Sequence, residues 1–415
     1  MDVLKIATAG SVDDGKSTLI GRLLFETNSI TTDKLEAIMA SSKKKGLDYV
    51  DLSLLTDGLI AEREQGITID VAHIYFSTPT RKFIIADTPG HFEYTRNMVT
   101  GASNANVSMI LVDARNGVVE QTFRHFYISC LLRIPNVVVC VNKMDLVDYD
   151  QTKFEEIKAA FMAFAEKVRF PGQEISFIPV SSLYGENLVR QSAHMPWYEG
   201  VSLLSLLEAM PLEQHLSEEA SRFPVQYVVR PKSEEFHDYR AYAGKVASGL
   251  LRKGERVVVL PSGQETTIAK IEKFGREIEA AQAKESISLL LEDDVDISRG
   301  DMIVPISQLP QQSRQLAATI CWMDKKPLRV GGTYLLQHGV NTSRAKVSAL
   351  SNLIDVATLG ADSAVSELKL NEIADVQLKT AKEVFYDSFT ENRANGAFIL
   401  IDEGTNSTVG VGLIR

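Results

Sequence analysis

The segment GSVDDGKST, residues 10–18, constrains the fold of this chain more than any other part of its sequence. It follows the apolar run VLKIATA and precedes the helix-like stretch TLIGRLLFET. The pattern G-x-x-x-x-G-K-[ST] between a strand and a helix predicts a loop whose backbone N–H groups surround phosphate oxygens. The alternative is a glycine-rich turn with a chance lysine, which would not explain the strand before the motif and the helix after it.

Within this loop each residue type has an expected part. Glycine lets the backbone curl around the phosphates, Lys16 is expected to reach the β- and γ-phosphates, and Ser17 is expected to ligate Mg²⁺ through its hydroxyl. The carboxylates of Asp13 and Asp14 would repel a triphosphate, so we expect their side chains to face away while their backbone N–H groups bind it. The predicted nucleotide-binding residues are Gly10, Ser11, Val12, Asp13, Asp14, Gly15, Lys16, Ser17 and Thr18.

Short runs rich in Val and Ile alternate with helical stretches over the first half of the chain. The runs KFIIADT, VSMILVDAR, NVVVCVNK and ISFIPVSS lack strict alternation, which is typical of parallel strands buried on both faces. Helical stretches such as QTKFEEIKAAFMAFAEKV lie between them. This order predicts a phosphate-loop α/β domain with a mostly parallel sheet over residues 1–220. The SSKKKG run at 41–46 is expected to be a solvated loop.

From about Phe223 the strands become short and alternating, with glycine-rich turns, as in YAGKVASGLLRKGERVVVLPSG. Such a pattern predicts antiparallel β structure in small barrels. The remaining length suffices for two of them, and the proline-containing segment VPISQLPQQS marks a boundary between them. We therefore expect one β-barrel over residues 221–308 and a second over residues 309–415.

Two further segments complete the expected phosphate and metal site. Asp87 ends the apolar run FIIAD and is expected to hold a Mg²⁺-bound water, although a helix cap is the structural alternative. Thr68, in the polar segment AEREQGITID, can complete the Mg²⁺ shell only while the γ-phosphate is present, which is the physical basis of a switch loop. The residues after Asp87 are also predicted to contact the nucleotide: Thr88, Pro89, Gly90 and His91.

The segments VNKMD, residues 141–145, and SSL, residues 181–183, each follow a predicted strand. The carboxylate of Asp145 can accept hydrogen bonds from guanine N1–H and from the exocyclic amine, whereas adenine offers no such pair of donors. The alkyl stem of Lys143 can lie along the base. The pocket is therefore expected to bind GTP rather than ATP through Asn142, Lys143, Met144, Asp145, Ser181, Ser182 and Leu183.

His91 directly follows Gly90, the residue expected to offer its backbone N–H to the γ-phosphate. An isolated histidine is most often structural, but this position favours a role in orienting the attacking water. His91, Lys16 and Thr68 form the expected catalytic set. Arg63 and Arg96 lie near the same segments, and surface salt bridges are their expected role.

The formal net charge of −10 disfavours a protein that coats nucleic acid, because neutralising phosphates requires a surplus of Lys and Arg. The three cysteines fit neither a disulfide framework nor a zinc site, and Cys130 and Cys140 are expected to be small core residues in a reducing, cytoplasmic setting. No apolar run approaches the roughly 18 residues of a membrane span, and the N-terminus lacks signal-peptide features. Neither a nucleic acid nor a membrane is therefore expected as a partner.

The segments GSVDDGKST, EREQGITID, DTPGHFEYTRNMVTGAS and VNKMD together resemble the translational GTPases of the elongation-factor type. Those proteins have a GTPase domain followed by two β-barrels. A narrower resemblance rests on RFPVQYVVRP, YRAYAGKVASG, DVDISRGDMIV and TVGVGLI, which are similar to the GTPase subunits of bacterial sulfate adenylyltransferase, or ATP sulfurylase. The resemblance covers essentially the whole chain.

In that family the GTPase pairs with a smaller catalytic subunit, which joins ATP and sulfate into adenosine 5′-phosphosulfate and pyrophosphate. GTP hydrolysis drives this step. The resemblance therefore implies GTP and Mg²⁺ as cofactors, a hetero-oligomer with the small subunit, and a sulfate and ATP site outside this chain.

Two alternatives stay open at the level of sequence. The segment AEREQGITID suits an elongation factor that delivers aminoacyl-tRNA equally well. Some members of the sulfate adenylyltransferase family also carry a C-terminal kinase domain. No second phosphate-loop pattern occurs before Arg415, and whether such a domain follows is left open.

Overall fold

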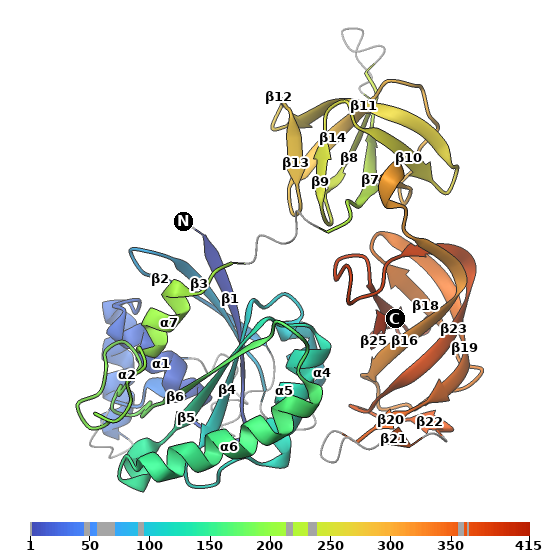
Figure 1. Cartoon of the computed structure of the whole chain (residues 1–415). Coiled ribbons are helices and arrows are strands. Elements are labelled where there is room, and N and C mark those ends of the chain that lie inside the picture. Colours follow the sequence, from blue (N-terminus) through green and yellow to red (C-terminus); the bar gives the residue numbers. More distant parts are fainter. Residues whose placement is uncertain are drawn as a thin grey trace. The chain divides into compact units, whose positions relative to one another are not determined.

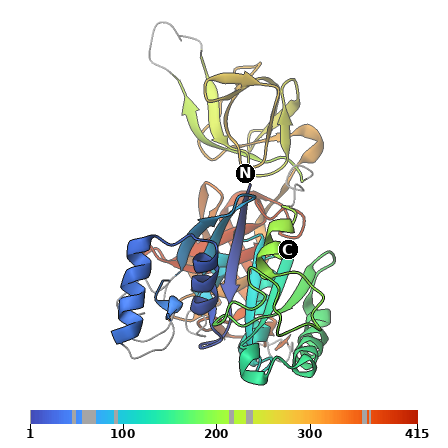
Figure 2. The same ribbon diagram turned by 90° about the vertical axis from the view of Figure 1, so that its left-hand side faces the viewer.

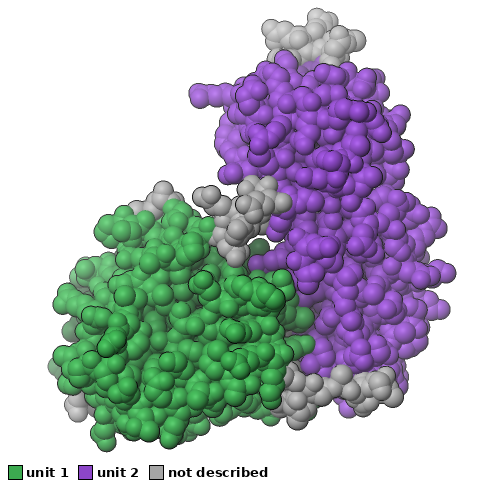
Figure 3. Space-filling model, in the orientation of Figure 1, with its two compact units in different colours: residues 1–212, 355–360 green, residues 213–354, 361–415 purple. Residues whose placement is uncertain are grey.

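The computed structural model describes residues 2–44, 50–55, 71–89, 95–212, 219–230, 239–355, 361–362 and 365–415. The chain divides into two compact units, residues 1–212 with 355–360 and residues 213–354 with 361–415 (Figure 3). Both β-barrels lie within the second unit. The three-part division with boundaries after residues 220 and 308 stays a prediction.

The first unit is built on a six-stranded sheet in the order β2-β3-β1-β4-β5-β6 (Figure 1). All its pairings are parallel except that of β2 with β3. The predicted mostly parallel α/β architecture is therefore confirmed. The strands are β1 (Val3–Ala9), β2 (Ala72–Ser77), β3 (Lys82–Asp87), β4 (Val107–Asp113), β5 (Asn136–Asn142) and β6 (Glu174–Pro179).

Helices cover both faces of this sheet, which explains why β4 and β5 are buried along their whole lengths (Figures 1 and 2). One face packs on α1 (Lys16–Glu26) and α7 (Leu203–Ala209) through a core of aliphatic side chains. The other face is covered by α4 (Thr95–Ala102), α5 (Glu120–Leu131) and α6 (Gln151–Val168). The rings of Phe126 on α5 and Phe161 on α6 pack edge to face. Cys140 lies in the core that contains side chains of α1 and α7, as predicted for a small core residue.

The run at 41–46 was expected to be a loop, but residues 41–44 belong to the helix α2 (Thr32–Lys44). Ser42 is buried and donates its hydroxyl to the Ile38 carbonyl one turn earlier. The sequence carries a signal for this helix, with Asp33 in its first turn and Lys43 and Lys44 in its last, where each charge complements the helix dipole. The expectation was therefore wrong for the part of the run that the structure describes.

The second unit consists of two antiparallel barrels of six strands each, as predicted. In the first, the pairing of β10 with β11 closes the ring β10-β15-β7-β8-β14-β11, visible end-on in Figure 2. Its strands are β7 (Phe223–Val229), β8 (Ala241–Lys245), β10 (Arg256–Leu260), β11 (Gln264–Lys273), β14 (Ser286–Leu291) and β15 (Met302–Pro305), with the short additions β9 (Leu250–Arg252), β12 (Arg276–Ile278) and β13 (Ala280–Gln282).

The second barrel closes through the ring β16-β23-β19-β18-β24-β25. Alternating side chains point inward along its long strands, and Trp322, which is 1% exposed, lies in its core. Its strands are β16 (Gln311–Trp322), β18 (Thr333–His338), β19 (Asn341–Ser351), β23 (Ile373–Tyr386), β24 (Ala397–Ile401) and β25 (Thr408–Ile414), with the short strands β17 (Leu328–Arg329), β20 (Leu353–Ile354), β21 (Ala361–Asp362) and β22 (Glu367–Leu368).

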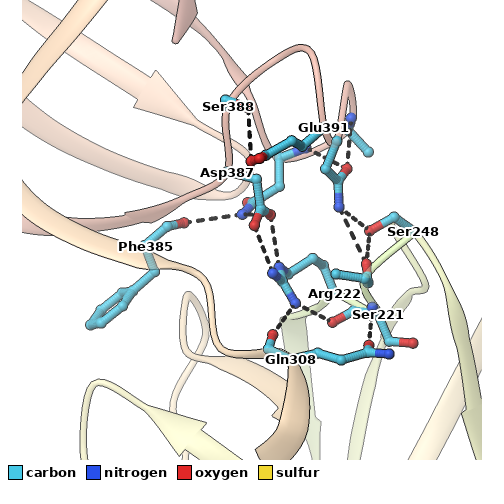
Figure 4. Close-up of polar contacts among 12 residues, drawn as sticks. Ser221, Arg222, Ser248, Gln308, Phe385, Asp387, Ser388 and Glu391 are labelled. Atoms are coloured by element: carbon cyan, nitrogen blue, oxygen red, sulfur yellow. Dashed lines mark hydrogen bonds and ion pairs between the residues drawn. The ribbon is translucent and has the colours of Figure 1, made fainter. Parts of the chain in front are cut away.

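A buried ion pair joins the two barrels (Figure 4). Arg222, just before β7, is 1% exposed and donates to both carboxylate oxygens of Asp387, at 2.8 and 2.7 Å. Its remaining terminal nitrogen donates to the carbonyls of Ser221 and Gln308, while Asn395 donates to Asp387 at 2.8 Å. Because nearly every polar atom of the pair has a partner, the charges are well compensated although they are removed from water.

We expect Arg222→Ala to lower the free energy of unfolding by about 3–5 kcal/mol, because it leaves the Asp387 carboxylate buried without its cation. Arg344→Ala is the matched control, since Arg344 makes the same two-point contact with Glu403 at 2.8 and 3.1 Å but both side chains are exposed. Its loss should be below about 1 kcal/mol. Urea unfolding followed by the fluorescence of Trp322, in a Trp197→Phe background, measures both, and equal losses would contradict the importance of the buried pair.

Candidate nucleotide-binding site

The predicted site residues gather at the carboxyl ends of the parallel strands. The loop at 10–15 follows β1, Asp87 ends β3, Asn142 ends β5 and Ser181 follows β6. Thr8 lies opposite Asp87 in the register of β1 and β3, and donates its hydroxyl to the Asp87 carboxylate at 3.0 Å. Ligands of open α/β sheets bind at this edge, so the topology brings together segments that are far apart in the sequence.

The phosphate loop has the backbone that its glycines and aspartates permit. Gly15 stands before α1 with φ of 91°, and a Cβ there would lie 2.5 Å from Nδ2 of Asn142. Asp13 also has a positive φ of 68°, a conformation that Asp tolerates better than most residues. The loop therefore turns tightly into the helix N-terminus, where free backbone N–H groups and the helix dipole favour an anion.

Lys16 lies within this loop and is 8% exposed. Its ammonium donates to the carbonyls of Gly10 at 2.9 Å and Ser11 at 3.2 Å. Burial lowers the pKa of Lys16, and the negative charges of Asp87 and Asp14 oppose that shift. Among the described residues no carboxylate lies within ion-pair distance of it, so a phosphate in the loop fits as its close counter-charge.

Asp13 and Asp14 differ more than the sequence indicated. Asp13 is exposed, whereas Asp14 is 5% exposed and its carboxylate accepts the backbone N–H of Ser11 at 2.5 Å. Burial raises the pKa of the Asp14 carboxyl, against the opposing effects of this hydrogen bond and of the positive charge on Lys16. The Asp14 side chain thus turns back onto its own loop and braces the loop.

Ser17 and Asp87 are the described residues predicted to hold Mg²⁺. Ser17 is the second residue of α1 and is partly buried, and Asp87 is 1% exposed at the end of β3. Thr88, the next residue, is fully buried and donates its hydroxyl to the Thr8 carbonyl. A hydroxyl and a carboxylate are hard oxygen donors, so this pair fits Mg²⁺.

Asn142 connects three loops of the site. Its Nδ2 donates to the Asp14 carbonyl at 2.7 Å, and its Oδ1 accepts both the backbone N–H of Ser182 at 3.0 Å and the Ser182 hydroxyl at 2.8 Å. Asn142 is 1% exposed, so each of these hydrogen bonds lies away from water. The residue therefore links the predicted phosphate loop to the predicted base loops.

Asp145 is held from one side by the hydroxyl of Ser181, which donates to Oδ1 at 2.6 Å. This bond fixes the carboxylate and leaves Oδ2 with capacity to accept further donors. Met144, the residue before it, is fully buried at the start of the short helix η3 (Met144–Val147). This arrangement of Asp145 fits the recognition of two guanine donors.

Lys143 has partners that the sequence analysis missed. Its ammonium lies 2.9 Å from Asp113, and Arg115 donates to the same carboxylate at 3.0 and 2.6 Å. Burial alone would raise the pKa of Asp113, but the hydrogen bonds from Arg115 and Lys143 outweigh it and lower the pKa to about 2. Asp113 ends β4 opposite Asn142, and this strand-end position was the available signal.

A second missed residue, Arg22 on α1, supports the loop after β6. Its Nε donates to the Ser182 carbonyl at 3.3 Å, and Nη2 donates to the carbonyl of Leu183. Leu183 is half-buried, whereas Ser181 and Ser182 are buried. The three predicted residues 181–183 therefore lie beside the Asn142–Asp145 segment. Thr68, Gly90, His91 and Arg63 lie outside the described residues, as does the side chain of Arg96.

The GTP-binding domain family of elongation factor Tu matches residues 1–216, and the family described as GTP-eEF1A C-terminal domain-like matches residues 315–415. The α/β fold, the phosphate loop and these matches define a GTP-binding protein of the elongation-factor type. The Ski7 GTPase-like domain of S. cerevisiae, solved bound to GTP, shares the fold with a TM-score of 0.52 at 18% identity, covering 100% of this chain and 97% of that domain.

Curated relatives match far more closely. Sulfate adenylyltransferase subunit 1 of Bacteroides fragilis (strain YCH46) is 48% identical over 415 residues, covering 100% of this chain and 86% of the relative. The bifunctional enzyme CysN/CysC of Mycobacterium tuberculosis (strain CDC 1551 / Oshkosh) is 50% identical over 413 residues, covering 99% of this chain and 67% of the relative. The chain belongs to the family of sulfate adenylyltransferase subunit 1.

Across the described stretches of the chain, no helix is both long enough and apolar enough to span a bilayer. Cys130, Cys140 and Cys321 are buried thiols outside any disulfide, and burial raises the pKa of both Cys130 and Cys140 to about 12. Thiols of this kind are protonated and unreactive at neutral pH.

We expect Asp145→Asn to lower GTP affinity at least about tenfold and to raise affinity for xanthosine triphosphate, because an amide donates where the carboxylate accepted. Asp150→Asn is the control, since Asp150 caps α6 nearby and Asn caps equally well. Equilibrium titration with fluorescent nucleotides measures both variants. Unchanged selectivity in Asp145→Asn would refute the assignment of this residue to the base.

We expect Asp14→Ala to weaken GTP binding about tenfold, because the partly buried Ser11 N–H loses its acceptor and the loop loses the hydrogen bond that braces it. Asp14→Asn keeps an acceptor oxygen and should retain most of the affinity. Asp13→Asn, an exposed change in the same loop, should have little effect. The same titration tests the series, and wild-type affinity in Asp14→Ala would show that the contact does not shape the loop.

Proposed function

We propose that this chain is the GTPase subunit of a sulfate adenylyltransferase. GTP hydrolysis on this chain drives the formation of adenosine 5′-phosphosulfate and pyrophosphate from ATP and sulfate on a small catalytic partner subunit. The observation that carries the proposal is the match of the entire chain, barrels included, to relatives named sulfate adenylyltransferase subunit 1. The arrangement of the loops at 10–18, 142–145 and 181–183 supports a GTP site.

In this proposal the described residues bind and orient the nucleotide. The loop N–H groups and Lys16 hold the phosphates, and Asp145 and Lys143 hold the base. Ser17 and Asp87 are the residues that would hold Mg²⁺, which supplies positive charge against the phosphates when bound. The hydrogen bonds of Asn142 keep the phosphate and base loops at a fixed separation, so the residues are organised before GTP arrives.

Two residues outside the described ranges complete the proposed mechanism. Thr68 would complete the shell of Mg²⁺ while the γ-phosphate is bound, and His91 would orient the attacking water. Hydrolysis then releases the contacts that depend on the γ-phosphate, and the resulting change reaches the partner subunit.

The sulfate and ATP site lies on the partner in this proposal. The sequence contains one G-x-x-x-x-G-K-[ST] pattern, and GTP uses it.

An elongation factor that delivers aminoacyl-tRNA would share the GTP site. The full-length matches to sulfate adenylyltransferase subunit 1 favour the metabolic role over that alternative. A cytoplasmic location follows from this role, because GTP and ATP are supplied there.

Co-purification of this chain with a small adenylyltransferase subunit, followed by an assay of adenosine 5′-phosphosulfate formation, tests the proposal. We expect a stable complex in which GTP stimulates product formation. In His91→Ala, GTP binding should persist while hydrolysis falls at least about tenfold, since positioning the water contributes a factor of this order or more.

The matched control is His73→Ala, a change on the edge strand β2, which should leave hydrolysis unchanged. Stimulation of the GTPase by ribosomes and aminoacyl-tRNA instead of by the small subunit would favour the elongation-factor alternative. Absence of both a complex and stimulation would overturn the proposed function while leaving the GTP site in place.

A further inference from the structure

A groove of about 450 Å³ lies in the second unit where the two barrels meet. One wall is the turn at 299–302 that enters β15, and the opposite wall is the tip of the β18–β19 hairpin at 338–343. The irregular stretch of β23 at 381–385, where the pairing with β16 shifts register, also lines it. None of the predicted GTP-site residues that the structure describes lines this groove.

The walls of the groove are tied together. Asn341 at the hairpin tip donates to the carbonyl of Gly300 in the opposite turn at 2.5 Å. Arg222 lines the groove and forms the buried pair with Asp387. Because these bonds connect the two barrels, the groove is preformed, and a ligand need not spend binding energy on shaping it.

The lining of the groove is predominantly apolar. Apolar residues from both barrels line it, among them Pro224, Leu260, Met302 and Phe385. The one buried cation in the lining, Arg222, already donates to Asp387 and to two carbonyls. A phosphate or sulfate placed inside would therefore find no unused buried cationic donor, whereas an apolar side chain would be well accommodated.

The exposed rim of the groove carries charged side chains of both signs. The groove is lined by three exposed cationic residues, Arg299, Arg314 and Lys382. Two residues with carboxylates, Asp301 and Glu383, also line it. Arg314 lies 3.9 Å from Glu383, whereas within the described part of the chain Arg299 and Lys382 have no carboxylate in ion-pair distance. Apart from the buried Arg222, the lining thus has one more positive than negative side chain, and two of its cations are not paired with a described carboxylate.

An apolar interior with a charged rim is the anatomy of a protein–protein contact site rather than of a small-anion site. The rim charge further selects a segment with carboxylates beside its apolar anchor. We propose that this groove binds a segment of the small catalytic subunit that inserts a large apolar side chain and places carboxylates against Arg299 and Lys382. The inference rests on the proposed function, which supplies the partner, and names the surface through which the barrels bind it.

The test measures the affinity of the full chain for a fluorescently labelled small subunit. Arg299→Glu/Lys382→Glu should weaken the complex at least about tenfold at low salt and flatten its dependence on ionic strength. The control Lys346→Glu/Lys379→Glu makes the same charge change at two exposed, neighbouring positions outside the groove and should have little effect. Ala381→Trp, which fills the groove, should weaken binding at every salt concentration.

Wild-type binding of the small subunit is established first, and its failure would refute the proposed function rather than this surface alone. Given that binding, wild-type affinity in both the charge-reversal and the groove-filling variants would overturn the inference. An equal loss in the control pair would show a diffuse charge effect and would also overturn it. Loss of GTP affinity in the isolated variants would assign the groove to the nucleotide cycle of this chain, which likewise contradicts a docking role.

Discussion

The arrangement of the candidate site depends on the hydrogen bonds of the Asn142 side chain. A single amide donates to the phosphate loop through the Asp14 carbonyl and accepts two donors from Ser182 in the loop after β6. The nitrogen and the oxygen of one amide group each hold one loop. The short, fixed distance between these two atoms therefore keeps the phosphate loop and the loop after β6 close together. The strand order places both loops at the same edge of the sheet, with β4 and β5 between β1 and β6, and Asn142 at the end of β5 is hydrogen-bonded to both.

The sequence predicted the site best where chemistry depends on position along a strand. Asp87, Asn142 and Ser181 lie at strand ends, as apolar runs followed by polar residues indicated. The inward turn of Asp14 was not predictable in this way, because repulsion by phosphate suggests exposure while a local N–H acceptor role favours burial. The pair Arg222–Asp387 spans 165 residues, and no local pattern links such positions.

The two units differ in how polar groups are used. In the first unit, buried charges belong to the loops of the candidate site. Lys16 lies in the phosphate loop, and Asp113 contacts Lys143 of the predicted base loop. In the second, the deepest charge pair serves to join two barrels that each have a complete hydrophobic core. Desolvating an ion pair costs free energy, and the hydrogen bonds around this pair offset part of that cost.

The buried pair also limits how the barrels can respond to events elsewhere in the chain. Separating them would break the Arg222–Asp387 ion pair and the hydrogen bonds that Arg222 donates to the Gln308 carbonyl and that Asn395 donates to Asp387. The motion that costs the least free energy is a displacement of both barrels together, which preserves the shape of their surface. A partner bound to the barrels would therefore move together with them, and the surface that it contacts would keep the same shape throughout the movement.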